Sequence, residues 1–463
     1  MITVCDAIMG SGKTEATITY INEHPEKKFI YITPFLEEAA RINRGCPNAN
    51  FVEPTNTKAA YKYTKIGHIE LLIQQGRNIA TTHVSYSHFT PSILEEVKRQ
   101  GYTLIIDECV EVMGCYTINR EELGIFVNNG LIAVEDNGQY TLTDKGLEYI
   151  ESGSHLYAHF SDLAAALRQE HVSIRTSKNG KEQIFYWNLL EEIFTSFDDV
   201  IILTYMFEGQ TLNYYFNIHK LRYERIGVVK HSDGTYHYGG YNVYKPSYVN
   251  ELKDKINFVG TKRMNKIGDS EFDLSLNWYK KHPAYREQVR KNIDNLFNHL
   301  FSGGNKEDRL WSTFKGYEKE ISNKRYVKNF LPFNARSTNA YRTATVLAYP
   351  VNIYMNGSQK SVLMQQGVDV DEDKYALSIM IQWIWRSAIR DGKEINVYIP
   401  SKRMRNLLIN WIDEVSNGGE AHCTGVKNVA SEKSSVPSTP TEEEMENQPK
   451  NHALTTSQLM KMN

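Results

Sequence analysis

Residues 7–14 read A-I-M-G-S-G-K-T, directly after the apolar run Ile2–Cys5 and before a helical-looking stretch that begins at Glu15. This order of strand, glycine-containing loop and helix is the context in which a phosphate-binding loop forms. Backbone N–H groups at the start of the helix, with the positive end of its dipole, favour a bound phosphate. The residues predicted to surround a β-phosphate are Gly10, Ser11 and Gly12. The stretch therefore predicts an α/β fold that binds a nucleoside phosphate.

The two residues that follow the glycine turn supply the remaining groups of such a site. Lys13 is predicted to place its ammonium near the β- and γ-phosphates, and Thr14 to give its hydroxyl to Mg²⁺. Ala7 stands where the first glycine of the motif is usual, and it is small enough to be tolerated. The alternative is a chance glycine-rich turn before a helix, which the lysine and threonine at these offsets disfavour.

A second apolar run, Leu104–Ile106, leads straight into Asp107 and Glu108. Carboxylates at the carboxyl end of a parallel strand lie at the crevice where such sheets bind ligands, and we expect this strand to neighbour that of the phosphate loop. Asp107 is then the Mg²⁺ partner, through water, and Glu108 orients or deprotonates the attacking water. The alternative is a strand end followed by a solvated acidic turn.

A third stretch, Q-W-I-W-R-S-A-I-R at 382–390, precedes the apolar run Ile395–Ile399. Arg386 and Arg390 lie four residues apart on an expected helix, so they face the same way. Guanidinium groups stay charged and bind phosphate oxygens with two parallel hydrogen bonds. Directed at a γ-phosphate from a second domain, such a pair acts as an arginine finger. The alternative is an amphipathic helix whose arginines face solvent.

Together these stretches resemble the motifs of superfamily 2 helicases, of the DEAD/DEAH-like kind found in phage replication modules. The phosphate loop at 7–14 resembles motif I, and I-D-E-C at 106–109 resembles motif II. L-T-Y-M-F-E at 203–208 resembles motif III, and the stretch at 382–390 resembles motif VI. The last departs from the pattern, because Trp385 replaces a glycine and the arginines are spaced by four residues instead of three.

Other stretches resemble the nucleic-acid contacts of that family. T-P-F-L-E-E-A-A-R-I at 33–42 is similar to motif Ia, and T-T-H at 81–83 to the motif that follows it. W-S-T-F-K at 311–315 and N-A-R-S-T-N at 334–339 are candidates for motifs IV and V. The nucleic-acid contacts that the resemblance implies are Thr33, Thr81, Thr82, Lys315, Arg336 and Thr338.

The resemblance implies an α/β fold with two RecA-like P-loop domains that hold ATP and Mg²⁺ in the cleft between them. It implies an ATP-dependent helicase or translocase whose partner is nucleic acid, DNA before RNA, in phage or mobile-element replication. The catalytic residues implied are Gln382, Arg386, Arg390 and Glu108, with Thr14 and Asp107 on the metal. Two alternatives remain: a terminase-like DNA-packaging ATPase, and an NTP-gated loader or switch that scarcely hydrolyses.

The pattern of strands and helices suggests how the chain is divided. An ATP-binding domain is expected over 1–245, with an insertion at 115–198. A helical connecting region is expected over 246–305, and a second RecA-like domain over 306–417. The polar composition of 418–463 predicts a disordered tail that serves as a tether for replication proteins.

Apolar runs predict the strands of both domains. Those of the first are Ile2–Cys5, Phe29–Ile32, Asn78–Thr81, Leu104–Ile106 and Val200–Leu203. Those of the second are Ala344–Tyr349, Ser361–Met364 and Ile395–Ile399. Within the insertion, a β-hairpin turning at Asn137-Gly138 and a following helix are expected, similar to a winged-helix wing.

Tyrosines and basic residues alternate over about 210–250. Aromatic rings among cations can stack bases and hold phosphates. The same composition suits a half-buried antiparallel sheet, and the sequence leaves both interpretations open.

Composition excludes several other classes of protein. The formal net charge is −2, which disfavours a purely electrostatic coat on DNA. No segment resembles a signal peptide or an apolar membrane span, so a cytoplasmic protein is expected, in a host cell if it is phage-encoded. The 5 cysteines are scattered without paired metal-ligand spacing, so neither a metal site nor a disulfide framework is expected from them.

Overall fold

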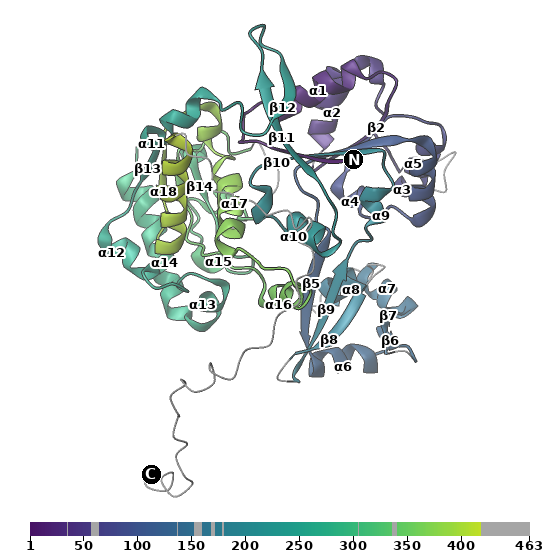
Figure 1. Cartoon of the computed structure of the whole chain (residues 1–463). Helices are drawn as coiled ribbons and strands as arrows, with labels where there is room; N and C mark the ends of the chain where they lie inside the picture. The colour runs from purple at the N-terminus through teal and green to yellow at the C-terminus, as the bar shows by residue number, and fades with distance from the viewer. Residues whose placement is uncertain are drawn as a thin grey trace, which may run out of the picture. The chain divides into compact units, whose positions relative to one another are not determined.

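The computed structural model describes residues 1–34, 36–56, 64–136, 138–151, 160–167, 172–177, 180–303, 305–335 and 340–417 (Figure 1). The expected tail at 418–463 lies outside these residues. Two largely parallel sheets dominate the chain, as the α/β prediction requires. We call the segment from β1 to β12 the first lobe and the segment from β13 to α18 the second lobe.

The first lobe is built on a seven-stranded sheet with the order β12-β11-β1-β10-β4-β2-β3. All neighbours are parallel except the β11–β12 hairpin. The bounds are β1 Ile2–Asp6, β2 Lys28–Thr33, β3 Ile79–Thr82, β4 Tyr102–Asp107, β10 Asp199–Thr204, β11 Glu224–Lys230 and β12 Tyr236–Gly240. The five strands predicted for this lobe are confirmed.

One detail of the predicted sheet is wrong. The strand that ends in Asp107 does not neighbour β1, because β10 lies between them and pairs with both. The register nevertheless aligns the carboxyl ends, since Cys5 lies opposite Leu203 and Leu203 opposite Asp107. The phosphate loop and the acidic strand end therefore share one edge of the sheet.

Both faces of this sheet are buried, which explains why its strands read as continuous apolar runs. Successive residues of β2 alternate between two core clusters. Ile30 and Ile32 pack on one face, and Phe29 and Tyr31 on the other. The covering helices include α1 Lys13–Glu23, α2 Leu36–Gly45, α3 Lys65–Gln74, α5 Pro91–Gln100 and α10 Thr211–Ile218.

The insertion leaves the first sheet after β4 and returns at β10 (Figure 1). It contains an antiparallel sheet with the order β5-β9-β8, formed by Met113–Asn119, Glu182–Asn188 and Val172–Thr176. The predicted hairpin is confirmed as β6 Ile132–Val134 paired with β7 Tyr140–Leu142, and α7 Asp144–Glu151 follows it. The described residues of the insertion also form helices α6 Arg120–Asn128, α8 Phe160–Leu167 and α9 Glu192–Thr195, and Asn137 of the predicted turn lies outside the described residues.

The second lobe is built on a four-stranded parallel sheet with the order β13-β16-β15-β14. Its strands are Ile256–Phe258, Ile395–Tyr398, Val346–Ala348 and Arg309–Trp311. The region expected to be helical supplies α13 Leu276–Lys281 and α14 Pro283–Asn295, but also the edge strand β13. That strand spans three residues, too few to show a period in the sequence.

Two predictions for this lobe are wrong. The expected strand at Ser361–Met364 is part of helix α16, Gly357–Gln365, which the Asn356 side chain caps. The helix expected to carry both arginines, α17 Glu372–Ile384, ends before them. Ser387 is extended, and the 3₁₀ turn Ala388–Asp391 follows it. The last helix, α18 Lys402–Ser416, packs against α17.

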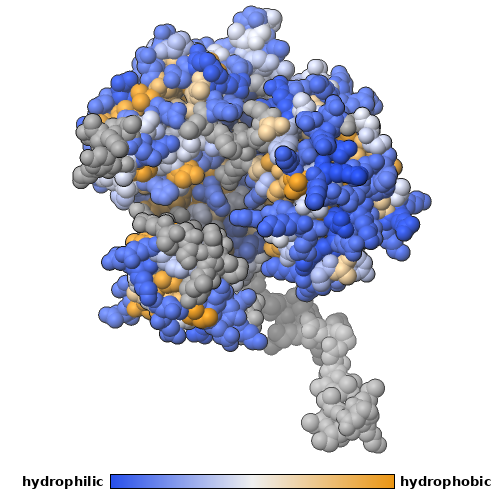
Figure 2. Space-filling model, turned by 180° about the vertical axis from the view of Figure 1, so that it is seen from behind, coloured by the Kyte–Doolittle hydropathy of each residue, from blue (hydrophilic) through white to orange (hydrophobic). Residues whose placement is uncertain are grey.

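The surface seen in Figure 2 is mainly hydrophilic, with small scattered apolar patches. No helix among the residues described is long and apolar enough to cross a bilayer.

The carboxylate of Asp6, at the end of β1, is a buried anchor of the first lobe. It accepts hydrogen bonds from the N–H groups of Met206 and Phe207, at 2.8 and 3.2 Å, and pairs with Arg225 at 2.7 Å. Asp6→Asn is expected to lower the free energy of unfolding by about 3 kcal/mol, because the amide would place an N–H donor against these buried donors. It would also remove one of the carboxylates that pair with Arg225, which Glu208 contacts as well, at 2.7 Å. Denaturant titration measures this loss.

Asp199→Asn is the matched control for Asp6→Asn. Asp199 also pairs with a cation, Lys27 at 2.9 Å, but its side chain is 34% exposed. The control is expected to cost less than about 1 kcal/mol. Equal losses in the two variants would contradict the role given to Asp6.

Candidate nucleotide site

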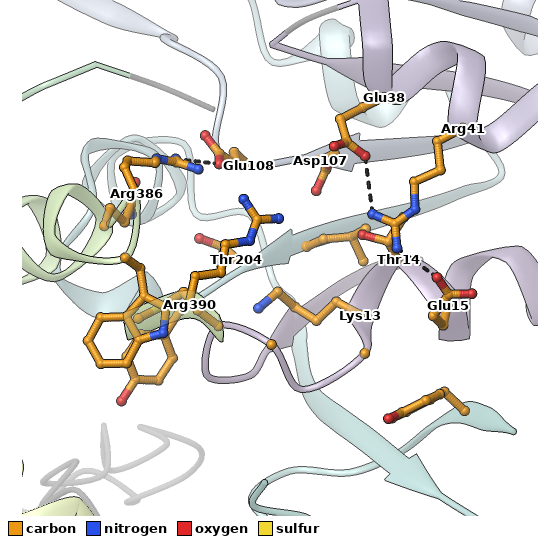
Figure 3. Close-up of a pocket in the computed structure, with 18 residues that line it drawn as sticks. Lys13, Thr14, Glu15, Glu38, Arg41, Asp107, Glu108, Thr204, Arg386 and Arg390 are labelled. Atoms are coloured by element: carbon orange, nitrogen blue, oxygen red, sulfur yellow. Dashed lines mark hydrogen bonds and ion pairs between the residues drawn. The ribbon is translucent and has the colours of Figure 1, made fainter. Parts of the chain in front are cut away.

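A cavity of about 350 Å³ lies where the carboxyl ends of the first sheet face α17 and the turn after it (Figure 3). Both lobes contribute to its wall. Its lining includes nine of the residues singled out from the sequence: Gly10, Gly12, Lys13, Thr14, Asp107, Glu108, Gln382, Arg386 and Arg390. Side chains separated by most of the chain length therefore meet around one space.

The glycine turn has the backbone that its sequence predicts. Gly10 and Gly12 have φ of 74° and 91°, in the region that favours glycine. Helix α1 begins immediately afterwards, at Lys13. Ser11 differs from the expectation, since its N–H donates to the carbonyl of Ile8 at 3.2 Å, inside the loop. Its side chain is buried, and the hydroxyl has no hydrogen-bond partner among the described residues.

Lys13 lies across its own loop. Its ammonium donates to the carbonyl oxygens of Ala7 and Ile8, at 2.5 and 3.2 Å. Burial lowers the pKa of Lys13, and nearby Cys5 and the carboxyl of Asp107 oppose that shift. An anion in the cavity would compete with these two carbonyls for the ammonium, because a charged acceptor forms the stronger hydrogen bond.

The acidic pair follows β4 directly. Burial, and after it the negative charges of Glu108 and Glu38, raise the pKa of Asp107 from 3.8 to about 7. Glu108 has a positive φ of 61°, and its N–H donates to the carbonyl of Leu203 at 3.0 Å. This backbone turn lets the two adjacent carboxylates leave the strand in different directions (Figure 3).

Glu108 meets the second lobe. Its Oε1 accepts from the guanidinium of Arg386 at 2.8 Å, while its Oε2 is buried without a hydrogen-bond partner among the described residues. Arg390 lines the same cavity, and burial together with the like charge of Arg386 lowers its pKa. The two arginines face one cavity although they do not share a helix, so the predicted convergence does not depend on the predicted helix.

Gln382 reaches the cavity from the last turn of α17. It also lines a second cavity of about 530 Å³, which extends from Glu108 toward the insertion and is bounded there by Trp187. Gln382 and Glu108 therefore stand between the two spaces.

Sequence reasoning missed Glu38 and Arg41, which line the first cavity from helix α2. Arg41 pairs with Glu15 at 2.6 Å and with Glu38 at 3.4 Å. The stretch that holds them was assigned to nucleic acid through its resemblance to motif Ia. The available signal was positional, because α2 follows the carboxyl end of β2, at the same sheet edge as the phosphate loop.

Three of the residues expected to contact nucleic acid lie together, because Thr33 of β2 pairs with Thr82 of β3, beside Thr81. Thr33 and Thr81 are fully buried in the first sheet, which contradicts a surface role for them. Thr82 caps helix α4, His83–Tyr86, by accepting from the N–H of Ser85. Lys315 is exposed on the second lobe. Arg336 and Thr338 lie outside the described residues.

Mg²⁺ is a hard cation that binds through one or two carboxylates together with substrate phosphates. Asp107 and the Thr14 hydroxyl line the cavity and offer oxygen ligands of this kind. Among the described residues there is no cluster of three or more His, Cys, Asp or Glu side chains arranged to hold a metal by itself. The donor set therefore fits a metal that a bound phosphate helps to hold.

Asp107→Asn is expected to raise the melting temperature of the nucleotide-free protein at pH 8. The pKa of the carboxyl group is about 7 in the folded state and 3.8 when unfolded, so the folded state loses stability as the pH rises from about 4 to 7, and the loss is complete above pH 7. Below about pH 4 the carboxyl is protonated in both states and the difference between variant and native protein disappears. Thermal unfolding at pH 4, 6 and 8 measures this, and a pH-independent difference would contradict it.

Comparison with known proteins gives a family. Residues 250–412 match the model of the "YonV C-terminal Rossmann-like domain". The "SPbeta prophage-derived uncharacterized protein YonV" of Bacillus subtilis (strain 168) is 34% identical over 417 residues, which are 89% of this chain and 98% of that protein.

Among solved structures, "XPD_Helicase" is 12% identical and covers 90% of this chain and 95% of its own, with a TM-score of 0.44. "Structure of S. tokodaii Xpd4" is also 12% identical, covers 89% of this chain and 94% of its own, and has a TM-score of 0.45. The identity to the Bacillus protein is much higher, and it extends over nearly the full length of both proteins. This chain therefore belongs to the YonV family.

Proposed function

We propose that this protein is an NTP-hydrolysing helicase or translocase that uses ATP and Mg²⁺ to move along nucleic acid, DNA before RNA. The observation that carries the proposal is the shared cavity. A phosphate loop and an acidic pair from the first lobe line it opposite two arginines from the second lobe. A triphosphate bound there would contact both lobes, so its hydrolysis would change the attraction between them.

Each side chain has a task in such a reaction. The N–H groups of the glycine turn and the ammonium of Lys13 would hold the phosphates, as the helix N-terminus also favours. Glu108 would orient the attacking water and accept its proton. Mg²⁺, where Thr14 and Asp107 hold it, would neutralise charge on the phosphate oxygens.

The ion pair between Glu108 and Arg386 supports a gated reaction. While Arg386 binds Oε1 of Glu108 and Oε2 is buried, neither oxygen is open to an attacking water. A γ-phosphate carries more negative charge than a carboxylate, and a guanidinium binds its oxygens with two parallel hydrogen bonds. If Arg386 moved from Glu108 to the γ-phosphate, the carboxylate would become available as the base, and the guanidinium would at the same time take the position of an arginine finger. Arg390 would add a second cation beside it.

The proposal that the protein moves along nucleic acid rests on the resemblance to superfamily 2 motifs. A role in phage DNA replication in the host cell is further supported by the prophage-derived relative. The ion pair between Glu108 and Arg386 gives a physical reason why nucleic-acid binding would change the rate of hydrolysis. A strand bound to both lobes would favour one separation of the lobes over another. The test compares ATP hydrolysis without nucleic acid and with single-stranded DNA, duplex DNA and RNA. A rate of ATP hydrolysis that none of the three nucleic acids changes would favour an NTP-gated switch. Metal-dependent nicking of DNA would favour a packaging ATPase.

Lys13→Ala and Glu108→Gln are expected to separate binding from chemistry. Loss of the Lys13 ammonium should abolish binding of Mg²⁺–ATP, because it removes the cation that neutralises the phosphates. Glu108→Gln should keep ATP binding within about threefold while turnover falls by roughly 10²-fold or more, as the loss of a general base predicts. Calorimetric titration and phosphate release measure the two quantities. Equal losses of binding and turnover in Glu108→Gln would contradict its role as base.

Arg386→Ala and Arg390→Ala are expected to lower turnover much more than ATP affinity. A finger acts on transition-state charge, and its loss costs about 10³- to 10⁵-fold in well-studied cases. Arg342→Ala is the matched control, because Arg342 is an exposed arginine that pairs with Asp391, next to Arg390, at 2.5 Å. It does not line the cavity, so its loss should leave turnover unchanged. Undiminished turnover in both cavity variants would exclude the second lobe from the reaction.

A further inference from the structure

The cavity has two ends, and the sheet order decides which group lies at each. β10 and β4 lie on one side of β1, and the β11–β12 hairpin lies on the other. The acidic pair belongs to the first side. A triphosphate whose γ-phosphate faces that pair therefore extends its sugar and base toward the hairpin.

Tyr236, the first residue of β12, stands at that second end. It lines the cavity together with Gly12 and Glu15. Its ring lies directly on Gly12, because a Cβ added to that glycine would come within 2.3 Å of the ring. The tyrosine is only partly buried, so part of its ring remains open to the cavity.

The ring is held in place by a rigid frame. Tyr238, two residues further along β12 and therefore on the same face, is bound through its hydroxyl to the hydroxyl of Thr17 on α1 at 2.7 Å. The ammonium of Lys230, opposite Tyr236 in the hairpin, lies 5.4 Å from the centre of the Tyr236 ring. A fixed aromatic ring beside a cation matches the arrangement that binds a base and its attached phosphates.

We propose that Tyr236 is the platform on which the base of the nucleoside triphosphate stacks. The proposal rests on the function proposed above, since it needs the triphosphate in this cavity. Stacking uses the π-face that every base has, so it separates bases by size more than by their hydrogen-bonding edges. The site is therefore expected to prefer purine over pyrimidine nucleotides and to discriminate little between ATP and GTP.

The test compares nucleotides with inorganic tripolyphosphate, which has the phosphates without sugar or base. Binding to the full chain is measured calorimetrically with Mg²⁺. Tyr236→Ala is expected to weaken ATP and GTP binding by roughly 5- to 100-fold and to leave tripolyphosphate within about twofold. Tyr236→Phe keeps the ring and is expected to retain ATP affinity within about threefold. For the native protein, ATP and GTP should bind more tightly than CTP and UTP.

Two controls separate the possible failures. His237→Ala alters the neighbouring residue of β12, which points to the other face of the strand, and is expected to leave ATP binding unchanged. Lys13→Ala is expected to abolish binding of ATP and tripolyphosphate alike.

If Tyr236→Ala weakens the binding of ATP and of tripolyphosphate equally, the ring only supports the loop and the platform is excluded. If the native protein binds tripolyphosphate but shows no preference for purines, the platform is again excluded while the phosphate site stands. Failure of every probe to bind the native protein would overturn the proposed function itself.

Discussion

The ion pair between Glu108 and Arg386 is the contact on which the rest of the candidate site depends. It joins the end of a strand in one sheet to the turn after a helix of the other, across the cavity that the phosphate loop lines. An ion pair that is largely removed from water is stable only while each charge has a partner. A competing anion in the cavity would therefore act on both lobes at once.

Several of the other polar contacts between the lobes are single ion pairs or hydrogen bonds. Lys374 of α17 pairs with Glu208 at 2.9 Å, and the indole N–H of Trp411 donates to the hydroxyl of Tyr205 at the same distance. Gly209 lets the backbones approach closely, because a Cβ there would come within 2.4 Å of the Lys374 carbonyl oxygen. Surface ion pairs and single hydrogen bonds contribute little each, so these polar contacts add little to the free energy that holds the lobes together.

Local patterns were enough to predict the glycine turn before α1, five of the seven strands of the first sheet and the acidic strand end at Asp107. The helix expected to include Arg386 could not be predicted correctly, since an extended Ser387 interrupts a run that contains no glycine or proline to mark the break. Tyr236 belongs to no motif, and Glu38 lies in a stretch whose resemblance to motif Ia predicts a contact with nucleic acid instead. They reach the cavity because the order of the strands brings α2 and the hairpin to the sheet edge, and that order depends on non-local packing that one sequence does not display.

The insertion, although part of the first lobe, also contacts the second lobe. Strand β5 begins shortly after Glu108, and its Thr117 hydroxyl lies 3.2 Å from that of Ser358 at the start of α16. Arg175 of β8 also donates to Gln365, at the end of the same helix. A movement of α16 away from the first sheet would therefore displace β5, which is close in sequence to Glu108. The insertion is therefore placed to transmit a force applied to α16 through β5 to Glu108 in the cavity.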